Sequence, residues 1–244
     1  MKNRALPLLA VLAAGLVCLP AADSAARSKK VRGRGPVVSR TMDLDDVRAV
    51  VHEISGTLII EQGRDEKLVV EAEQNLHEYL DIRQRGGTLR IGSRRRVDLR
   101  PTEPVRFRLT VRNLEEIALN GSGDVEADGL DVPELELDLR GSGDVTLADL
   151  AAGTLDVSIS GSGDVEADGR VDAQRIRISG SGDYDAVGLR SEAASAAVSG
   201  SGSIAIWVRE TLEAAISGSG DIRYRGEPRL RRRSVSGSGD IEPI

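Results

Sequence analysis

The chain has 244 residues, enough for one domain or for one domain behind a leader, and 40% of them are hydrophobic, which suffices for a core. Aromatic residues make up only 2%, whereas a compact globule normally fills irregular space with Phe, Tyr and Trp. This composition favours an interior built from rows of Val, Ile and Leu. The formal net charge of -6 argues against nucleic acid as a partner.

A secretory signal peptide is predicted over residues 1–26. A basic N-terminus precedes an apolar run at residues 5–19, and small residues follow. The apolar run is too short for a mature anchor, so we expect no integral membrane segment in the exported chain. Cys18 is the only cysteine, and Val17 directly before it does not fit a lipidation signal. We therefore expect an exported protein without disulfides, periplasmic or extracellular and outer-membrane-associated.

Residues 27–40 are rich in Lys, Arg and Gly and poor in apolar side chains. This composition predicts a disordered basic linker. The remaining residues, 41–244, are expected to form a single β-helix domain, with irregular opening coils at 41–120 and regular coils at 121–244.

Short strands are predicted in the opening half because apolar and polar residues alternate between glycine-containing turns. The expected strands cover residues 47–52, 57–62, 67–73, 88–92 and 105–112, and one helical turn is expected within 75–80. We interpret these segments as opening coils that also cap the stack.

The second half repeats the string Gly-Ser-Gly-Asp, and only its fifth copy departs from it, at Ser203. The first glycines follow one another at steps of 20, 20, 19, 20, 18 and 19 residues. Such regularity predicts an all-β parallel β-helix, a solenoid with about 19–20 residues per coil and Gly-Ser-Gly turns on one edge. Positive φ angles or tight packing would each explain the glycines. The turn glycines are Gly121, Gly123, Gly141, Gly143, Gly161, Gly163, Gly180, Gly182, Gly200, Gly202, Gly218, Gly220, Gly237 and Gly239.

Apolar residues recur at fixed positions around each turn. They occupy the second and fourth positions before the first glycine and the fourth and sixth positions after it, while intervening positions are largely polar. Inward side chains should therefore stack in rows between two short strands per coil. One row is interrupted by Arg233, which indicates that the last coil is open to solvent.

These repeats closely resemble the bacterial head GIN domain family. The resemblance rests on the Gly-Ser-Gly-Asp turns, on Ile54-Ser55-Gly56-Thr57-Leu58-Ile59-Ile60, and on Asp221-Ile222-Arg223-Tyr224-Arg225-Gly226-Glu227-Pro228 before the final Ser-Gly-Ser-Gly. It covers about residues 44–241. The resemblance implies a parallel β-helix with two main sheets and an exported protein of the autotransporter-adhesin type.

The aspartates of the turns form the main candidate metal site. Stacked carboxylates could bind calcium, because hard cations take several oxygen ligands. We favour instead an Asp that accepts a backbone N–H within its own turn, since calcium-binding β-rolls repeat at about nine residues. No metal or cofactor is therefore assigned. The column comprises Asp124, Asp144, Asp164, Asp183, Asp221 and Asp240.

Trp207 and Arg225 are the candidate binding residues. Alternation places Trp207 on the outer surface. Val187 and Arg225 occupy the equivalent positions of the neighbouring coils. The indole could stack on a sugar ring or contact Arg225 by a cation–π interaction, although structural cover of the variable turn is the preferred interpretation. His52 and His77 lack a metal-ligand spacing and are expected to be surface or strand histidines.

The sequence favours a non-enzymatic module that contacts envelope polysaccharide or other surface proteins, as a monomer or a homo-oligomer. A purely structural envelope module is the alternative. A carbohydrate-active enzyme is less favoured: its two carboxylates would lie about 5 to 9.5 Å apart, and an evenly stacked column offers such distances without selecting any pair. No catalytic residue is assigned.

Overall fold

The computed structural model describes residues 28–244, so the predicted signal peptide lies outside the described residues. The opening half contains β1 (Lys29–Arg32), β2 (Val37–Asp43), β3 (Ala49–His52), β4 (Thr57–Gln62), β5 (Lys67–Glu73), the 3-10 turn η1 (His77–Tyr79), β6 (Leu80–Arg85), β7 (Thr88–Ser93), β8 (Val97–Arg100), β9 (Arg106–Val111) and β10 (Glu116–Leu119). The second half contains β11 (Asp124–Asp128), β12 (Asp131–Leu139), β13 (Val145–Ile159), β14 (Val165–Ile178), β15 (Tyr184–Val198), β16 (Ile204–Ile216), β17 (Ile222–Arg225), β18 (Arg229–Val235) and β19 (Ile241–Pro243).

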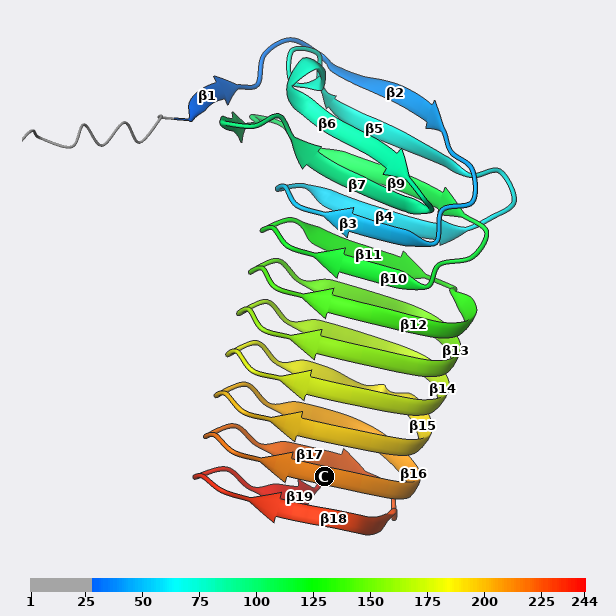
Figure 1. Cartoon of the computed structure of the whole chain (residues 1–244), viewed down its shortest axis with the longest axis vertical. Coiled ribbons are helices and arrows are strands. Elements are labelled where there is room, and N and C mark those ends of the chain that lie inside the picture. Colours follow the sequence, from blue (N-terminus) through cyan, green and yellow to red (C-terminus); the bar gives the residue numbers. More distant parts are fainter. Residues whose placement is uncertain (1–27) are drawn as a thin grey trace, which may run out of the picture.

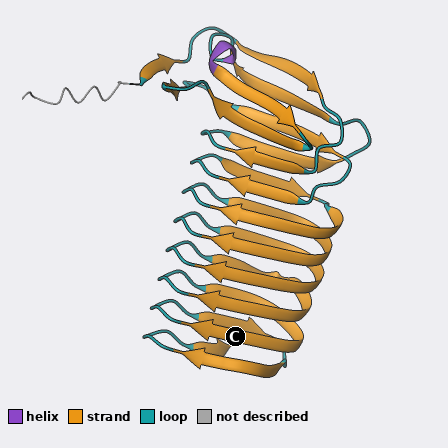
Figure 2. Ribbon diagram, viewed as in Figure 1, coloured by secondary structure: helices purple, strands orange, loops and turns teal. Residues whose placement is uncertain are grey.

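The predicted all-β solenoid is confirmed. Successive coils pair in parallel and form one tall stack (Figure 1). One sheet carries β3, β10 and β12, and the other carries β4 and β11; from β13 to β16 each strand bends around the variable edge and contributes to both sheets. The Gly-Ser-Gly turns follow one another along the opposite edge, as loops on the left of Figure 2.

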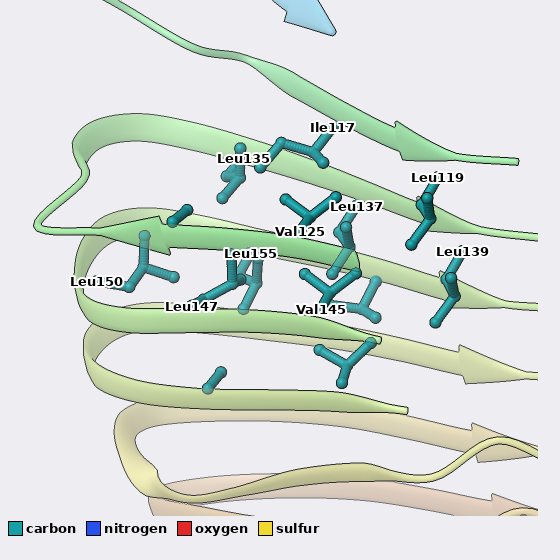
Figure 3. Packing of buried hydrophobic residues seen from close by; sticks show 14 of the residues in the cluster. Ile117, Leu119, Val125, Leu135, Leu137, Leu139, Val145, Leu147, Leu150 and Leu155 are labelled. Atoms are coloured by element: carbon teal, nitrogen blue, oxygen red, sulfur yellow. The ribbon is translucent and has the colours of Figure 1, made fainter. Parts of the chain in front are cut away.

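The interior consists of the predicted apolar rows. Ile117 pairs in register with Leu137, which pairs with Val157, and all three side chains are buried. Figure 3 shows the labelled leucines and valines of successive coils projecting into the space between the two sheets. Burying one such side chain contributes about 1.5 to 3 kcal/mol, so the rows supply the main stabilisation of the stack.

Tight packing, and not positive φ, explains the turn glycines. None of them is among the described residues with positive φ. A Cβ on Gly143 or Gly163 would overlap the carbonyl oxygen of the equivalent glycine one coil earlier. Hydrogen bonds reinforce this contact, as where the N–H of Ser162 donates to the Gly141 carbonyl at 3.1 Å. The glycines therefore set the distance between coils at this edge.

The opening half differs from the predicted series of coils. Antiparallel pairs β2–β5, β5–β9 and β6–β7 close its end of the stack, and β3 and β4 lie between β7–β9 and β10–β11, out of chain order (Figure 1). A parallel stack leaves unpaired backbone groups at its end, and antiparallel strands cover them. The expected strands 57–62 and 67–73 match β4 and β5, and η1 lies where the helical turn was expected.

The expectation of a disordered linker at residues 27–40 is wrong for two segments. Residues 29–32 form β1, which pairs in parallel with β8, and residue 37 begins β2. The Asn75 side chain accepts from the backbone of Arg34 at 2.7 Å. Composition missed this order because pairing with β8 and burial of the single apolar side chain of β1, Val31, hold the basic strand, and both depend on distant segments.

The last coil is exposed, as Arg233 predicted. Every residue of β18 is exposed, and Arg233 pairs in register with Ala214 of the apolar row. Its guanidinium donates to the carbonyl of Ile241 at 3.3 Å. The Arg233 guanidinium therefore lies across the end of the apolar core.

Replacing a turn glycine should strongly destabilise the stack. In Gly163→Ala, the new Cβ meets the Gly143 carbonyl, so coils must separate or shift; we expect a loss of about 1 to 3 kcal/mol in the free energy of unfolding, measured in urea. The exposed neighbour supplies the control, because Ser162→Ala should change stability by less than about 0.5 kcal/mol. Equal effects of the two substitutions would contradict the packing explanation.

Candidate functional site

A column of side chains follows the variable edge of the stack. Register pairing places Arg170 beside Arg190, Arg190 beside Trp207, and Trp207 beside Arg225, one residue from each of four successive coils. In the other direction, Arg170 lies beside Ala151, and Ala151 beside Asp131. We call Asp131, Ala151, Arg170, Arg190, Trp207 and Arg225 the edge column.

The coil that carries Trp207 is the shortest of the repeat. Its step from Gly200 to Gly218 is 18 residues, against 20 in the preceding coil. The pairing of β15 with β16 consequently shifts register twice, between Ala186 and Arg190 and again after Ser191. The sequence-based expectation that Val187 is the neighbour of Trp207 is therefore wrong. The shortened coil brings Arg190 to the indole instead.

A buried polar network lies directly under this shortened coil. The Tyr184 hydroxyl donates to Gln174 at 3.1 Å, the Gln174 amide donates to Ser191 at 2.9 Å, and the Ser191 hydroxyl donates to the Trp207 carbonyl at 2.9 Å. All three side chains are buried, and burial raises the pKa of Tyr184, which keeps the phenol protonated. A satisfied buried network fixes local geometry. It therefore holds the backbone of Trp207 in place.

Sequence reasoning missed this network. Its detectable signals were Gln174 and Ser191, polar residues on strands where apolar side chains would fill the core. Their partnership depended on the register shifts, which the repeat spacing alone does not reveal.

The Trp207 indole lies between the Arg225 guanidinium and a groove. The Arg225 guanidinium lies 4.4 Å from the centre of the indole, so the cation–π contact that was one of the alternatives for Trp207 is present. On the other side, the indole joins Arg170 and Arg190 in lining a groove of about 570 Å³. Asp131, Asp149, two leucines and three small residues complete this lining. A second hollow, of about 560 Å³, continues past Arg170 toward Pro133 and Asp172.

The arginines of the edge column take part in few ion pairs. Among the ion pairs of residues 28–244, none involves Arg170 or Arg225. Arg190 lies 3.8 Å from Glu192, whose carboxylate is closer to Arg209, at 2.9 Å. The groove therefore offers two cationic side chains, Arg170 and Arg190, beside the carboxylates of Asp131 and Asp149.

The turn aspartates bond between coils, not within their own turn as expected. The Asp124 carboxylate accepts from the N–H of Asp144 at 3.1 Å, and Asp144 accepts from Asp164 at 2.9 Å. The ladder continues through Asp183 and, at 2.6 Å, to the N–H of Ser203. In residues 28–244 no group of acidic, His or Cys side chains is arranged to hold a metal ion. The column acts as a hydrogen-bond ladder that joins the coils.

A separate acidic hollow lies near the cap. Its volume is about 640 Å³, and Glu116, Glu134 and Glu136 contribute to its lining. Burial, followed by the neighbouring carboxylates, raises the pKa of Glu136. This negative surface would repel an anionic ligand, so it differs in chemistry from the groove at Trp207.

Both histidines are buried. His52 lies in strand β3, as one of the two predicted positions allowed. His77 lies in η1, so the prediction of a surface or strand position is wrong for that residue. His52 Nε2 donates to the Gly56 carbonyl at 3.1 Å, and its Nδ1 is buried without a partner. The imidazole packs edge-on against Phe107 under the first turn. Burial lowers its pKa, against the raising effects of the Gly56 carbonyl and Asp124.

The fold and the edge column define a capped parallel β-solenoid with a lateral groove. The family described as "Putative auto-transporter adhesin, head GIN domain" matches residues 48–228, and the chain belongs to this family. A comparison with curated proteins found no match. In the described residues, no helix is long and apolar enough to span a membrane.

Solved structures share this architecture. A "putative adhesin" from Bacteroides fragilis is 24% identical with a TM-score of 0.83, and the alignment covers 88% of this chain and 100% of that one. A "putative lipid binding protein" from Parabacteroides distasonis is 27% identical with a TM-score of 0.74 and the same coverage. A "putative adhesin" from Parabacteroides merdae is 20% identical with a TM-score of 0.68, covering 88% and 99% of the two chains.

The aspartate ladder should need an acceptor oxygen but no cation. Asp164→Ala removes the acceptor for the Asp183 N–H and should cost about 1 kcal/mol, whereas Asp164→Asn keeps an oxygen acceptor and should be at least as stable as the parent. Urea unfolding measures both differences. Chelator should leave the melting temperature unchanged; a fall on adding chelator, restored by calcium, would show instead that the carboxylates bind the ion.

His52 should make the protein less stable in mild acid. Its pKa in the folded state lies below the ordinary value of 6.5, so the unfolded chain takes up a proton first. Stability should therefore fall as the pH drops below about 6.5, by at most about 1.4 kcal/mol per pH unit for one group. His52→Leu should flatten the slope of unfolding free energy between about pH 6.5 and 5. An unchanged slope would contradict this assignment.

Proposed function

We propose that the chain is a non-enzymatic adhesin-like module of the bacterial cell envelope, exported through the leader at residues 1–26, and that the Trp207 groove is its contact surface for glycan or other surface proteins. The observation that carries this proposal is the shortened coil. It places a half-buried aromatic ring at the edge of the stack, in a groove that two cationic side chains also line. Family membership supports an adhesin-like role at the surface.

The surroundings of Trp207 favour binding over mere cover of a turn. A side chain that only covers a turn needs no defined backbone position, whereas the carbonyl of Trp207 is held by a buried three-residue network. Groups held rigidly before binding lose less conformational freedom when the ligand arrives. The edge column is therefore a preorganised surface.

The turn carboxylates support the non-enzymatic part of the proposal. Glycoside hydrolysis requires an acid and a base in different environments. Asp144 and Asp164 occupy equivalent exposed positions, and each uses an oxygen to accept the amide of the next coil. Neither is set apart as a proton donor.

Removing the indole should weaken binding without unfolding the chain. We expect Trp207→Ala to reduce binding of residues 28–244 to its glycan or cell-surface target by about tenfold, because the apolar stacking face is lost. Its backbone carbonyl still accepts from Ser191, so urea stability should change little. Val187→Ala, on the same edge outside the groove lining, is the matched control and should bind normally.

Binding would be measured on a glycan array, on isolated envelope polysaccharide and on whole bacterial cells. Failure to bind any of them would contradict the adhesin proposal. Light scattering would then decide whether the chain assembles with itself, as a purely structural module would. Binding unaffected by Trp207→Ala would show that the contact surface lies elsewhere.

A further inference from the structure

We infer that the edge column binds an acidic polysaccharide, with the polymer lying along the stack and its carboxylate or sulfate groups on Arg170 and Arg190. This inference rests on the proposed function and names the chemical class of its ligand. Its basis is the register that places two guanidinium groups and one indole on consecutive coils of one groove.

The spacing of the column suits a linear polymer. Consecutive parallel strands lie about 4.8 Å apart, so Arg170 to Arg225 spans three steps, or about 14 Å. Arg190 separates Arg170 from Trp207, so the two cations precede the aromatic ring along the axis. An anionic group on one sugar can bind a guanidinium while the apolar face of a following ring packs on the indole.

The cations are available for a ligand. Arg170 takes part in none of the ion pairs of residues 28–244, and Glu192, the ion-pair partner of Arg190, is shared with Arg209. Arg225 covers the far side of the indole and adds positive charge behind it. A guanidinium forms paired hydrogen bonds with planar oxyanions, which a hydroxyl of a neutral sugar cannot match in strength.

Acidic side chains on both flanks favour a narrow polymer over a flat membrane. Asp149 and Asp168 lie on one side of the column, and Asp172 and Glu192 on the other; the three aspartates are exposed. A planar anionic surface would bring its charge against these carboxylates. A single chain lying on Arg170 and Arg190 contacts fewer of these carboxylates, and of the four only Asp149 lines the groove.

Small residues leave the floor of the path open. Ala151 and Gly169 line the groove, and Ala151 and Arg170 also line the second hollow, so the two hollows adjoin along the edge. Asp131 occupies the cap-side end of the column. Its negative charge limits the anionic site to the coils beyond it.

The test compares charged polymers with uncharged forms of the same backbone. Residues 28–244 would be titrated by calorimetry with polygalacturonate, with its fully methyl-esterified form, with dextran sulfate and with dextran. Both anionic polymers should bind at least tenfold more tightly than their neutral forms, and raising the salt concentration should weaken binding. Arg170→Gln combined with Arg190→Gln should reduce the affinity for the anionic polymers at least tenfold.

A matched variant controls for net charge. Arg177→Gln combined with Arg223→Gln removes the same charge from the outward faces of β14 and β17, away from the groove, and should leave binding within about twofold. Urea unfolding of both double variants would establish that each is folded.

The outcomes separate this inference from the proposed function. Neutral polymers that bind as tightly as the charged ones, through Trp207 and without the arginines, would overturn the anionic inference and leave the adhesin proposal standing. Arginine-dependent binding to phosphatidylglycerol vesicles but not to either anionic polymer would overturn it in favour of a membrane surface. Equal losses in the two double variants would also overturn it. No binding to polymers, vesicles or cells would overturn both proposals.

Discussion

The close approach of backbone to backbone at the Gly-Ser-Gly edge is the constraint on which the rest of the structure depends. From Gly141 onward, each turn glycine lies against the carbonyl of its counterpart in the preceding coil, at a distance that leaves no room for a Cβ. A serine amide of each such turn donates to a glycine carbonyl of the preceding coil, and a turn aspartate accepts the amide of the following coil, except where Ser203 replaces the aspartate. Because this edge is uniform, the apolar rows on the strands that flank it stay in register.

The opposite edge has no such constraint, and it accommodates the differences in coil length from β13 to β16; the extra residue of the last coil falls within β18. The register shifts between β13 and β16 fall at or next to the variable turns, where residues are gained or lost without disturbing the glycine contacts. A solenoid can therefore vary its lateral surface while its stacking contacts are retained. The groove at Trp207 arises in this way, since loss of residues in one coil brings Arg190 beside the indole.

The buried network shows how such a break is stabilised. A polar group in an apolar interior is costly unless it is hydrogen-bonded, and Tyr184, Gln174 and Ser191 satisfy one another and the Trp207 carbonyl. The interior is otherwise apolar through these coils. The buried polar network and Trp207 at the edge of the stack thus belong to the same local departure from the repeat.

The sequence by itself determined the solenoid, its coil length and its buried rows, because the Gly-Ser-Gly-Asp spacing and the alternation of apolar residues are local features that each coil repeats. The tertiary structure decided what depends on pairing between distant segments. The cap is antiparallel because the end of a parallel stack must be covered, and strand β1 is ordered because β8 pairs with it. The aspartates bond to the next coil, which residue-level turn chemistry did not indicate. Arg190 and Arg170 join Trp207 only through shifted register, so the groove became visible only once the coils were stacked.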